Sequence, residues 1–145
     1  MSVYVYAQFK IGEIEPPKVC MNILKDLFVG HYLDPAIHHA IGVDKNNMFD
    51  KDSFIAVYER YEERARSDFA ELTRLKGIRQ SKDYYTLSED GKMALTDDID
   101  SAIESFNDHS RRAYVCQHMI DTLNMFEDMF AEERAKCLVE IIVES

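Results

Sequence analysis

Hydrophobic side chains recur at spacings of three and four residues along much of the chain, which is the pattern of helices that bury one face. The longest of these stripes runs over Phe54–Leu75 and contains no glycine or proline. It predicts one long helix. Asp52 or Ser53 would cap this helix, because either side chain can accept a hydrogen bond from the first turn.

Two further stripes follow in the C-terminal half of the chain. Leu95–Phe106 predicts a helix over residues 89–107, and Cys116–Phe130 predicts another helix after a new cap at Asp108 or Ser110. Neighbouring stripes of this kind suit helices that pack on one another or on a second copy of the chain. We therefore expect the C-terminal helices to pack together or to dimerise.

Both ends of the chain carry residues typical of strands. Val3–Ile11 alternates and is rich in Val, Tyr and Phe, which predicts a strand. Leu138–Val143 is rich in β-branched residues and leaves two alternatives open. It forms either a last helical turn or an edge strand beside Val3–Ile11.

Short elements are expected between the first strand and the long helix. Two prolines lead into a stripe over Val19–Phe28, which predicts a helix, and His31–Leu33 predicts a short extended piece. A capping aspartate followed by proline predicts a short helix over residues 34–42. The polar residues 43–51 predict a loop.

The most specific local pattern lies between the long helix and the next one. Gly77 stands where a helix commonly ends, and Ser81–Asp83 are turn formers between two short segments, Ile78–Gln80 and Tyr84–Leu87. These features predict a β-hairpin. Ser88 follows as the cap of the next helix, whose first turn holds two carboxylates.

These elements define a mainly α-helical protein with a small β element (α+β), built around a helix–hairpin–helix unit. No linker divides the chain, so we expect a single domain over residues 1–145. No apolar run approaches the ~20 residues of a membrane span, and the first residues lead us to expect no secretion signal. Three widely spaced cysteines predict reduced thiols, so we expect a cytoplasmic protein without a membrane partner.

Charge is distributed unevenly along the chain. The formal net charge is −10. Residues 60–82 carry seven basic and four acidic side chains, whereas residues 83–145 carry five basic and fifteen acidic ones. A basic segment indicates an anionic partner such as nucleic acid, and an acidic surface indicates a basic partner.

The order of elements resembles a winged helix-turn-helix domain of the kind seen in PadR-like and MarR-like regulators. The resemblance covers roughly residues 17–106, so the winged-helix-like unit is expected over 17–107 with a C-terminal helical arm over 108–145. It is carried by these motifs: Leu75-x-Gly77-Ile78, Tyr85-x-Leu87-Ser88-x-x-Gly91-x-x-x-Leu95, and the extended His31–Leu33.

The resemblance implies a homodimeric regulator that binds duplex DNA, with a recognition helix in the major groove and the wing on the backbone or in the minor groove. Arginine suits bidentate contact with guanine. The DNA-binding residues so implied are Arg64, Arg66, Arg74 and Lys76 on the helix, with Arg79 and Lys82 on the wing.

The alternative is an acidic protein-binding inhibitor, of the immunity-protein or phage anti-defence type, that blocks a basic partner such as a nuclease. Carboxylates would occupy the partner's phosphate-binding surface and accelerate association. The face expected to do so comprises Asp97, Asp98, Asp100, Glu104, Asp108, Glu127 and Asp128, followed by Glu132 and Glu133.

Enzyme chemistry is weakly indicated. Asp34 and His38 are four residues apart, but a metal site needs three or four ligands. Arg112 and His118 resemble the Arg and His element of HEPN ribonucleases, although Ala113 stands where that element usually has a polar residue. We therefore expect no catalytic residues, no metal and no cofactor.

Overall fold

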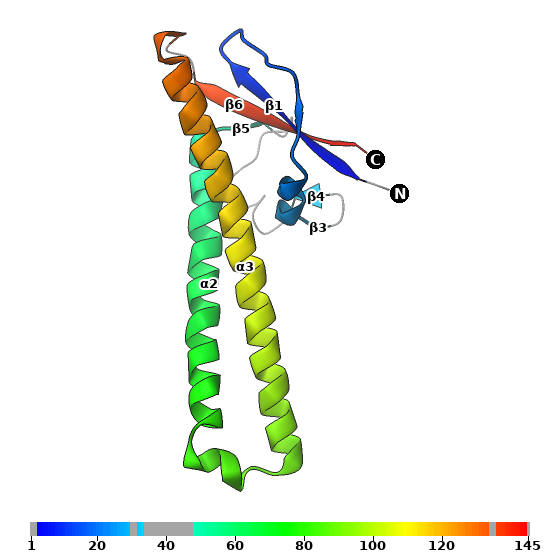
Figure 1. Ribbon diagram of the computed structural model, residues 1–145, viewed down its shortest axis with the longest axis vertical. Coiled ribbons are helices and arrows are strands. Elements are labelled where there is room, and N and C mark those ends of the chain that lie inside the picture. Colours follow the sequence, from blue (N-terminus) through cyan, green and yellow to red (C-terminus); the bar gives the residue numbers. More distant parts are fainter. Residues whose placement is uncertain (1–2, 30–31, 34–47, 134–135, 145) are drawn as a thin grey trace. The chain divides into compact units, whose positions relative to one another are not determined.

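A computed structural model describes residues 3–29, 32–33, 48–133 and 136–144 (Figure 1). The chain forms two compact units: unit 1 is Met1–Glu59 with Arg112–Ser145, and unit 2 is Arg60–Arg111. The long helices α2 (Lys51–Arg79) and α3 (Glu89–Met129) each contribute residues to both units. The helix predicted over 34–42 and most of the loop predicted over 43–51 lie outside the described residues.

Unit 1 contains a four-stranded antiparallel sheet. Its strands are β1 (Tyr4–Ile11), β2 (Val19–Cys20), β5 (Met48–Phe49) and β6 (Cys137–Glu144), in the order β2-β1-β6-β5. The coarse prediction of a mainly helical protein with a small β element is therefore confirmed.

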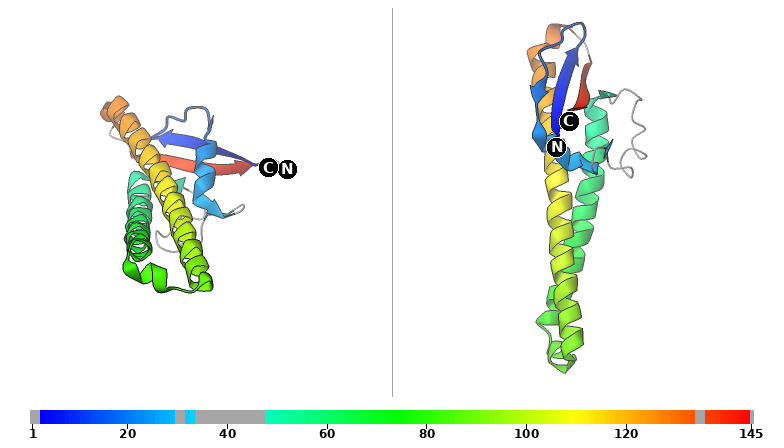
Figure 2. Two further views of the ribbon diagram at one scale, coloured as in Figure 1. Left: turned by 60° about the horizontal axis from the view of Figure 1, so that its bottom comes forward. Right: turned by 90° about the vertical axis from the view of Figure 1, so that its right-hand side faces the viewer.

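The pairing of β1 with β6 dominates this sheet. Eight residue pairs join them, from Tyr4 opposite Glu144 to Ile11 opposite Cys137, and the two strands lie side by side in Figure 2. The N-terminal strand is thus confirmed. The C-terminal segment is a strand, as one of the two alternatives held, but β6 lies between β1 and β5 rather than at the edge.

The core of unit 1 follows the alternation of these strands. Every second side chain of β1 from Val5 is buried, and β6 shows the same pattern from Cys137. The C-terminal part of α3 covers this sheet face, since the Phe9 ring on β1 lies 4.8 Å, centroid to centroid, from Phe126 on α3. The most deeply buried side chains of this part of α3 are Val115, Cys116, Met119 and Leu123.

The helix predicted over Val19–Phe28 is wrong. The segment forms β2, the 3-10 helix η1 (Asn22–Leu27) and β3 (Phe28–Val29), which pairs with β4 (Tyr32–Leu33). The extended piece at Tyr32–Leu33 is confirmed. Pairing with β1 explains the difference, because the Met21 amide donates to the Val5 carbonyl and extends the chain there. The apolar spacing of three that suggested an α-helix is satisfied by a 3-10 turn that buries Leu24 and Leu27.

The long α2 helix is confirmed, but its predicted cap is wrong. The helix begins at Lys51, and Asp50 caps it: its Oδ1 accepts hydrogen bonds from the Ser53 amide at 2.8 Å and from the Ser53 hydroxyl at 2.9 Å. Ser53 is therefore the donor to the cap and not the cap itself. In the loop predicted over 43–51, Met48–Phe49 is a strand, because it pairs with Glu140 and Val139 of β6.

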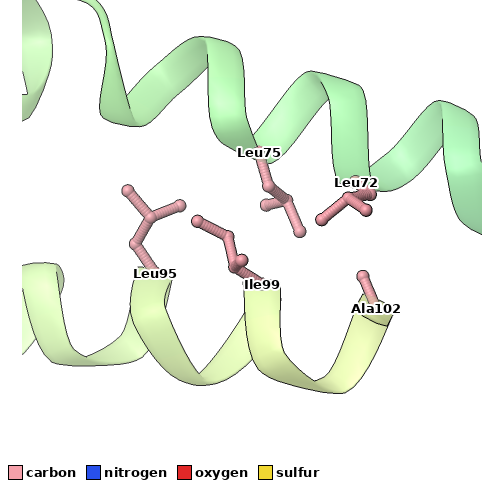
Figure 3. Close-up of a cluster of buried hydrophobic side chains, with 5 residues drawn as sticks. All are labelled: Leu72, Leu75, Leu95, Ile99 and Ala102. Atoms are coloured by element: carbon pink, nitrogen blue, oxygen red, sulfur yellow. The ribbon is translucent and has the colours of Figure 1, made fainter. Parts of the chain in front are cut away.

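Unit 2 is a helical hairpin in which α2 and α3 run in opposite directions. Leu72 and Leu75 of α2 face Leu95, Ile99 and Ala102 of α3 in one buried cluster (Figure 3). The helix cap at Ser88 is confirmed, because its Oγ accepts a hydrogen bond from the Gly91 amide at 3.1 Å.

The β-hairpin predicted between the helices is wrong. Ile78 and Arg79 continue α2, and the residues after the turn form the 3-10 helix η2 (Lys82–Thr86). Gly77 does not end the helix. Ile78 and Tyr84 pack against the buried cluster, so apolar contact at the end of the hairpin favours helical geometry over two short strands.

The new cap predicted at Asp108 or Ser110 is also wrong. Both residues lie inside α3, which is continuous over Glu89–Met129. Asp108 instead pairs with Arg111 one turn later, at 3.0 Å. The segment from Lys92 to Met129 contains no glycine or proline, so nothing in it breaks the helix.

Candidate protein-binding surface

All six residues predicted to bind DNA lie in unit 2, but several are engaged by neighbouring groups. Arg74 donates two hydrogen bonds to Glu71, at 3.0 and 2.6 Å, and this contact raises the pKa of Arg74 and lowers that of Glu71. Arg66 pairs with Glu62. The Arg64 guanidinium lies 5.9 Å from the centre of the Tyr61 ring.

These cations do not form one stripe along α2. Arg64 and Arg66 are two residues apart, which places them on different faces of a helix. Lys76 and Arg79 are exposed at the end of α2, and Lys82 is exposed in η2 where the wing was expected. The structure therefore brings the six residues into one unit without gathering them on one surface.

Four of the predicted acidic residues share one face of α3 in unit 2. Asp97, Asp100, Glu104 and Asp108 follow one another at spacings of three, four and four residues. This spacing places them on one face, opposite the buried positions of the same helix. We call these four residues the acidic stripe. Within the described part of the chain, Asp97, Asp100 and Glu104 form no ion pair.

A depression of about 640 Å³ runs along the acidic stripe. Three of its acidic residues line the depression, together with Ile103, whose side chain is 36% exposed. Arg111 also lines it and donates to Asp108. The complete lining is Asp100, Ser101, Ile103, Glu104, Ser105, Asn107, Asp108 and Arg111.

The other predicted acidic residues lie elsewhere. Asp98 is exposed and is placed where it interacts electrostatically with Arg74 of α2. Glu127 belongs to unit 1, where its Oε2 accepts a hydrogen bond from Lys51 at 3.0 Å. Asp128 is exposed in unit 1, and Glu132 is exposed in the 3-10 helix η3 (Ala131–Glu133).

Unit 2 contains a polar cluster that was not predicted from the sequence. His109 Nδ1 lies 2.6 Å from Asp68 Oδ2, and the Ser105 hydroxyl donates to the same oxygen at 3.0 Å. Tyr61 stacks on the His109 ring at 6.1 Å between centroids. We call Asp68, Ser105 and His109 the polar staple, because they join α2 to α3. Asp68 follows the buried Ala65 by three residues and precedes the buried Leu72 by four, so it lies on the same side of α2. A carboxylate at that spacing was the available signal.

The polar staple does not form a nucleophilic relay. Such a relay needs the serine hydroxyl on one imidazole nitrogen and the carboxylate on the other. Here the Ser105 hydroxyl donates to the carboxylate and lies 3.4 Å from Nδ1, the nitrogen that already contacts Asp68. The polar staple is therefore a set of hydrogen bonds that connects α2 to α3.

The remaining chemical candidates are weak in this structure. Arg112 is half-buried and His118 exposed, six residues apart on α3, whereas Asp34 and His38 lie outside the described residues. In the described ranges, no three His, Cys, Asp or Glu side chains converge as a metal site requires. Burial raises the pKa of the Cys116 thiol to about 12.

Comparisons with protein-family models, curated proteins and solved structures return no match to this chain. Among the helices that the structure describes, none combines the length and apolar character needed to cross a membrane.

Proposed function

We propose that this chain is a protein-binding protein that uses the acidic stripe to occupy a basic surface on its partner, as an inhibitor of a nuclease or of another nucleic-acid-binding protein does. The observation that carries the proposal is the alignment of the acidic stripe on one face of a continuous helix, where Asp97, Asp100 and Glu104 are exposed and Asp108 is half-buried.

The helix supports such a role because it holds the carboxylates in place before binding. Leu95, Ile99 and Ala102 anchor the opposite face of α3 in the buried cluster. Little conformational entropy is then lost when a partner docks, which favours affinity. The partly exposed Ile103 adds an apolar contact within an otherwise polar surface.

The charges of the two helices in unit 2 also favour a basic partner. The α3 segment 89–111 carries seven acidic and two basic side chains, a net charge of −5. The α2 segment 60–79 carries six basic and four acidic side chains, a net charge of +2. The acidic helix attracts cationic surfaces and accelerates encounter. The basic helix is largely compensated by its own carboxylates, which disfavours duplex DNA as the partner.

The test is affinity capture with the full chain, comparing two triple variants of equal charge change. Asp97→Lys/Asp100→Lys/Glu104→Lys reverses the acidic stripe. The control, Glu13→Lys/Glu59→Lys/Glu63→Lys, reverses three exposed carboxylates outside it. We expect the wild type and the control to retain one basic protein that the stripe variant loses, with affinity falling as salt rises.

The competing proposal, a DNA-binding regulator, is tested with the wild type and one further variant. Salt-titrated binding to duplex DNA is measured for the wild type and for Arg74→Glu/Lys76→Glu/Arg79→Glu. Steeply salt-dependent binding that this variant abolishes would favour the regulator. Equal capture of the basic protein by the stripe variant and the control would refute the acidic-stripe proposal.

A further inference from the structure

The two halves of the acidic stripe are supported in different ways. Asp97 and Asp100 belong to turns of α3 whose opposite side carries the leucine, isoleucine and alanine of the buried cluster (Figure 3). These apolar side chains pack against α2, so they fix the rotation of the turns about the helix axis. The directions of Asp97 and Asp100 are therefore set by the apolar core of unit 2.

The turns of α3 that carry Glu104 and Asp108 have no such apolar anchor. The structure describes α3 throughout, and none of its side chains over residues 103–112 is buried. The ring of Phe106 contacts Phe69 of α2, but the Phe69 side chain is 57% exposed, so this contact excludes little water. Apolar packing therefore holds these turns less firmly than it holds the turns over the buried cluster.

The polar staple supplies the support that apolar packing does not. Ser105 and His109 are four residues apart, so they share one face of α3. Both contact the same carboxylate oxygen of Asp68 on α2, at 3.0 and 2.6 Å. An ionised carboxylate only accepts hydrogen bonds, which assigns the donor proton of the second contact to His109 Nδ1. The buried ring of Tyr61 stacks on the imidazole and restricts its orientation further.

These contacts also fix the directions of two stripe residues. Glu104 immediately precedes Ser105, and Asp108 immediately precedes His109. Neighbouring residues of an α-helix differ by about 100° in direction, so fixing one member of each pair fixes the other. In addition, Ser105 itself lines the depression along the acidic stripe.

We infer that Asp68 of α2 is a positioning residue for the acidic stripe, because its carboxylate holds the α3 turns that present Glu104 and Asp108 to a partner. Asp68 acts through Ser105 and His109 and is not a member of the stripe. The inference rests on the proposed function. The rigidity of these turns can nevertheless be measured without a partner.

The first measurement is amide hydrogen exchange of the full chain, in which Asp68→Ala is compared with Asp68→Asn. Both variants remove the same charge, but asparagine keeps a side-chain oxygen that accepts hydrogen bonds. We expect Asp68→Ala to accelerate exchange of the amides of residues 105–111 at least about tenfold, and Asp68→Asn at most about twofold. Amides of residues 97–102 should change less than about twofold in both, because the buried cluster holds them.

The second measurement is binding of a helical alanine–lysine peptide whose lysines recur every three and four residues, as the carboxylates of the stripe do. The wild type should bind it with an affinity that falls as salt rises. Asp68→Ala should bind at least about threefold more weakly than Asp68→Asn, because a stripe that is no longer held must be ordered on binding. The stripe variant Asp97→Lys/Asp100→Lys/Glu104→Lys should lose the peptide, and its triple control should retain it.

The possible outcomes separate the two proposals. Equal exchange of the 105–111 amides in Asp68→Ala and Asp68→Asn, with wild-type circular dichroism spectra, overturns the positioning role. Equal affinity of these two variants for the peptide also overturns it. Peptide binding that the stripe variant retains refutes the proposed function instead. Ser105→Ala removes one of the two donors and should accelerate the same amides by a smaller factor, so it replaces Asp68→Ala if that variant loses helical content.

Discussion

The core that stabilises unit 1 differs in kind from the core that stabilises unit 2. Unit 1 buries alternate side chains of β1 and β6 under α3, so its core has the two-dimensional extent of a sheet face. Unit 2 depends on the contact between two helices. Along that contact, the buried cluster of leucine, isoleucine and alanine side chains is followed by the polar staple. A helix packed on a sheet face buries a broad apolar area, whereas two helices packed on each other bury a narrow strip. Unit 2 therefore relies more on specific hydrogen bonds.

The largest expected effect comes from the two cores. Leu123→Ala removes a fully buried side chain of unit 1 and should lower the free energy of unfolding by about 2–5 kcal/mol. Leu72→Ala, at a position 9% exposed in unit 2, should cost less, near the lower end of that range. Urea denaturation measures both. Equal losses would show that the contact between the two helices is packed as tightly as the sheet face.

The polar staple should give the next largest effect. Asp68→Leu removes the acceptor for both Ser105 and His109, and it should cost about 1–3 kcal/mol because two half-buried polar groups lose their partner. Asp97→Leu, at an exposed position on the same hairpin, serves as the control and should change stability little. Hydrogen exchange should show the loss mainly in amides of unit 2. A uniform loss over both units would remove the distinction.

The cap of α2 gives a smaller effect in unit 1. Asp50→Ala should cost about 0.5–2 kcal/mol, because the Ser53 amide loses its acceptor. Burial raises the pKa of Asp50. Hydrogen bonds from Lys136 and Ser53 together lower this pKa by a larger amount, so the net shift is downward from 3.8.

The sign of that shift sets the pH dependence of the Asp50 effect. A carboxyl with a depressed folded pKa stabilises fully above its ordinary value and loses its contribution as the pH falls through the lowered value. The difference in stability between wild type and Asp50→Ala should thus be constant at neutral pH and shrink below about pH 4. A difference that grows in acid would contradict this account.

The smallest expected effect concerns the labelling of cysteine thiols, because the two buried cysteines should stay unmodified. All three cysteines belong to unit 1; Cys20 is exposed, and Cys116 and Cys137 are buried. Burial raises the pKa of both buried thiols. Iodoacetamide should therefore modify Cys20 alone, as mass spectrometry would show. Leu72→Ala should leave this pattern unchanged, whereas Leu123→Ala should accelerate labelling at Cys116. Equal acceleration by both would mean that the units open together.

Elements with strong periodicity could be predicted from the sequence. The alternation of Val3–Ile11 is compatible only with a strand, and the spacing of Phe54–Leu75 only with an α-helix; both elements form. Segments whose structure depends on distant partners could not be predicted. The stripe over Val19–Phe28 forms short strands and a 3-10 helix because part of it pairs with β1. Likewise, packing of Ile78 and Tyr84 on the cluster overrides the turn-forming residues between them.

The candidate site was predictable in composition but not in arrangement. The sequence singled out the acidic residues of α3, and helical spacing places four of them on one face once the helix is known to be continuous. It could not separate them from Glu127, whose partner Lys51 is 76 residues away in the chain. The polar staple joins residues 37 and 41 positions apart, which local patterns do not connect.

The pairing of β1 with β6 has a consequence for synthesis of the chain. A ribosome produces β1 before unit 2, and β6 emerges only after all of unit 2 has been made. Residues 60–111 are contiguous, so the helical hairpin can form while β1 still lacks the neighbour that covers its long edge. An unpaired strand rich in Val, Tyr and Phe is prone to aggregate. The nascent chain is therefore most vulnerable between the completion of unit 2 and the release of Cys137–Glu144.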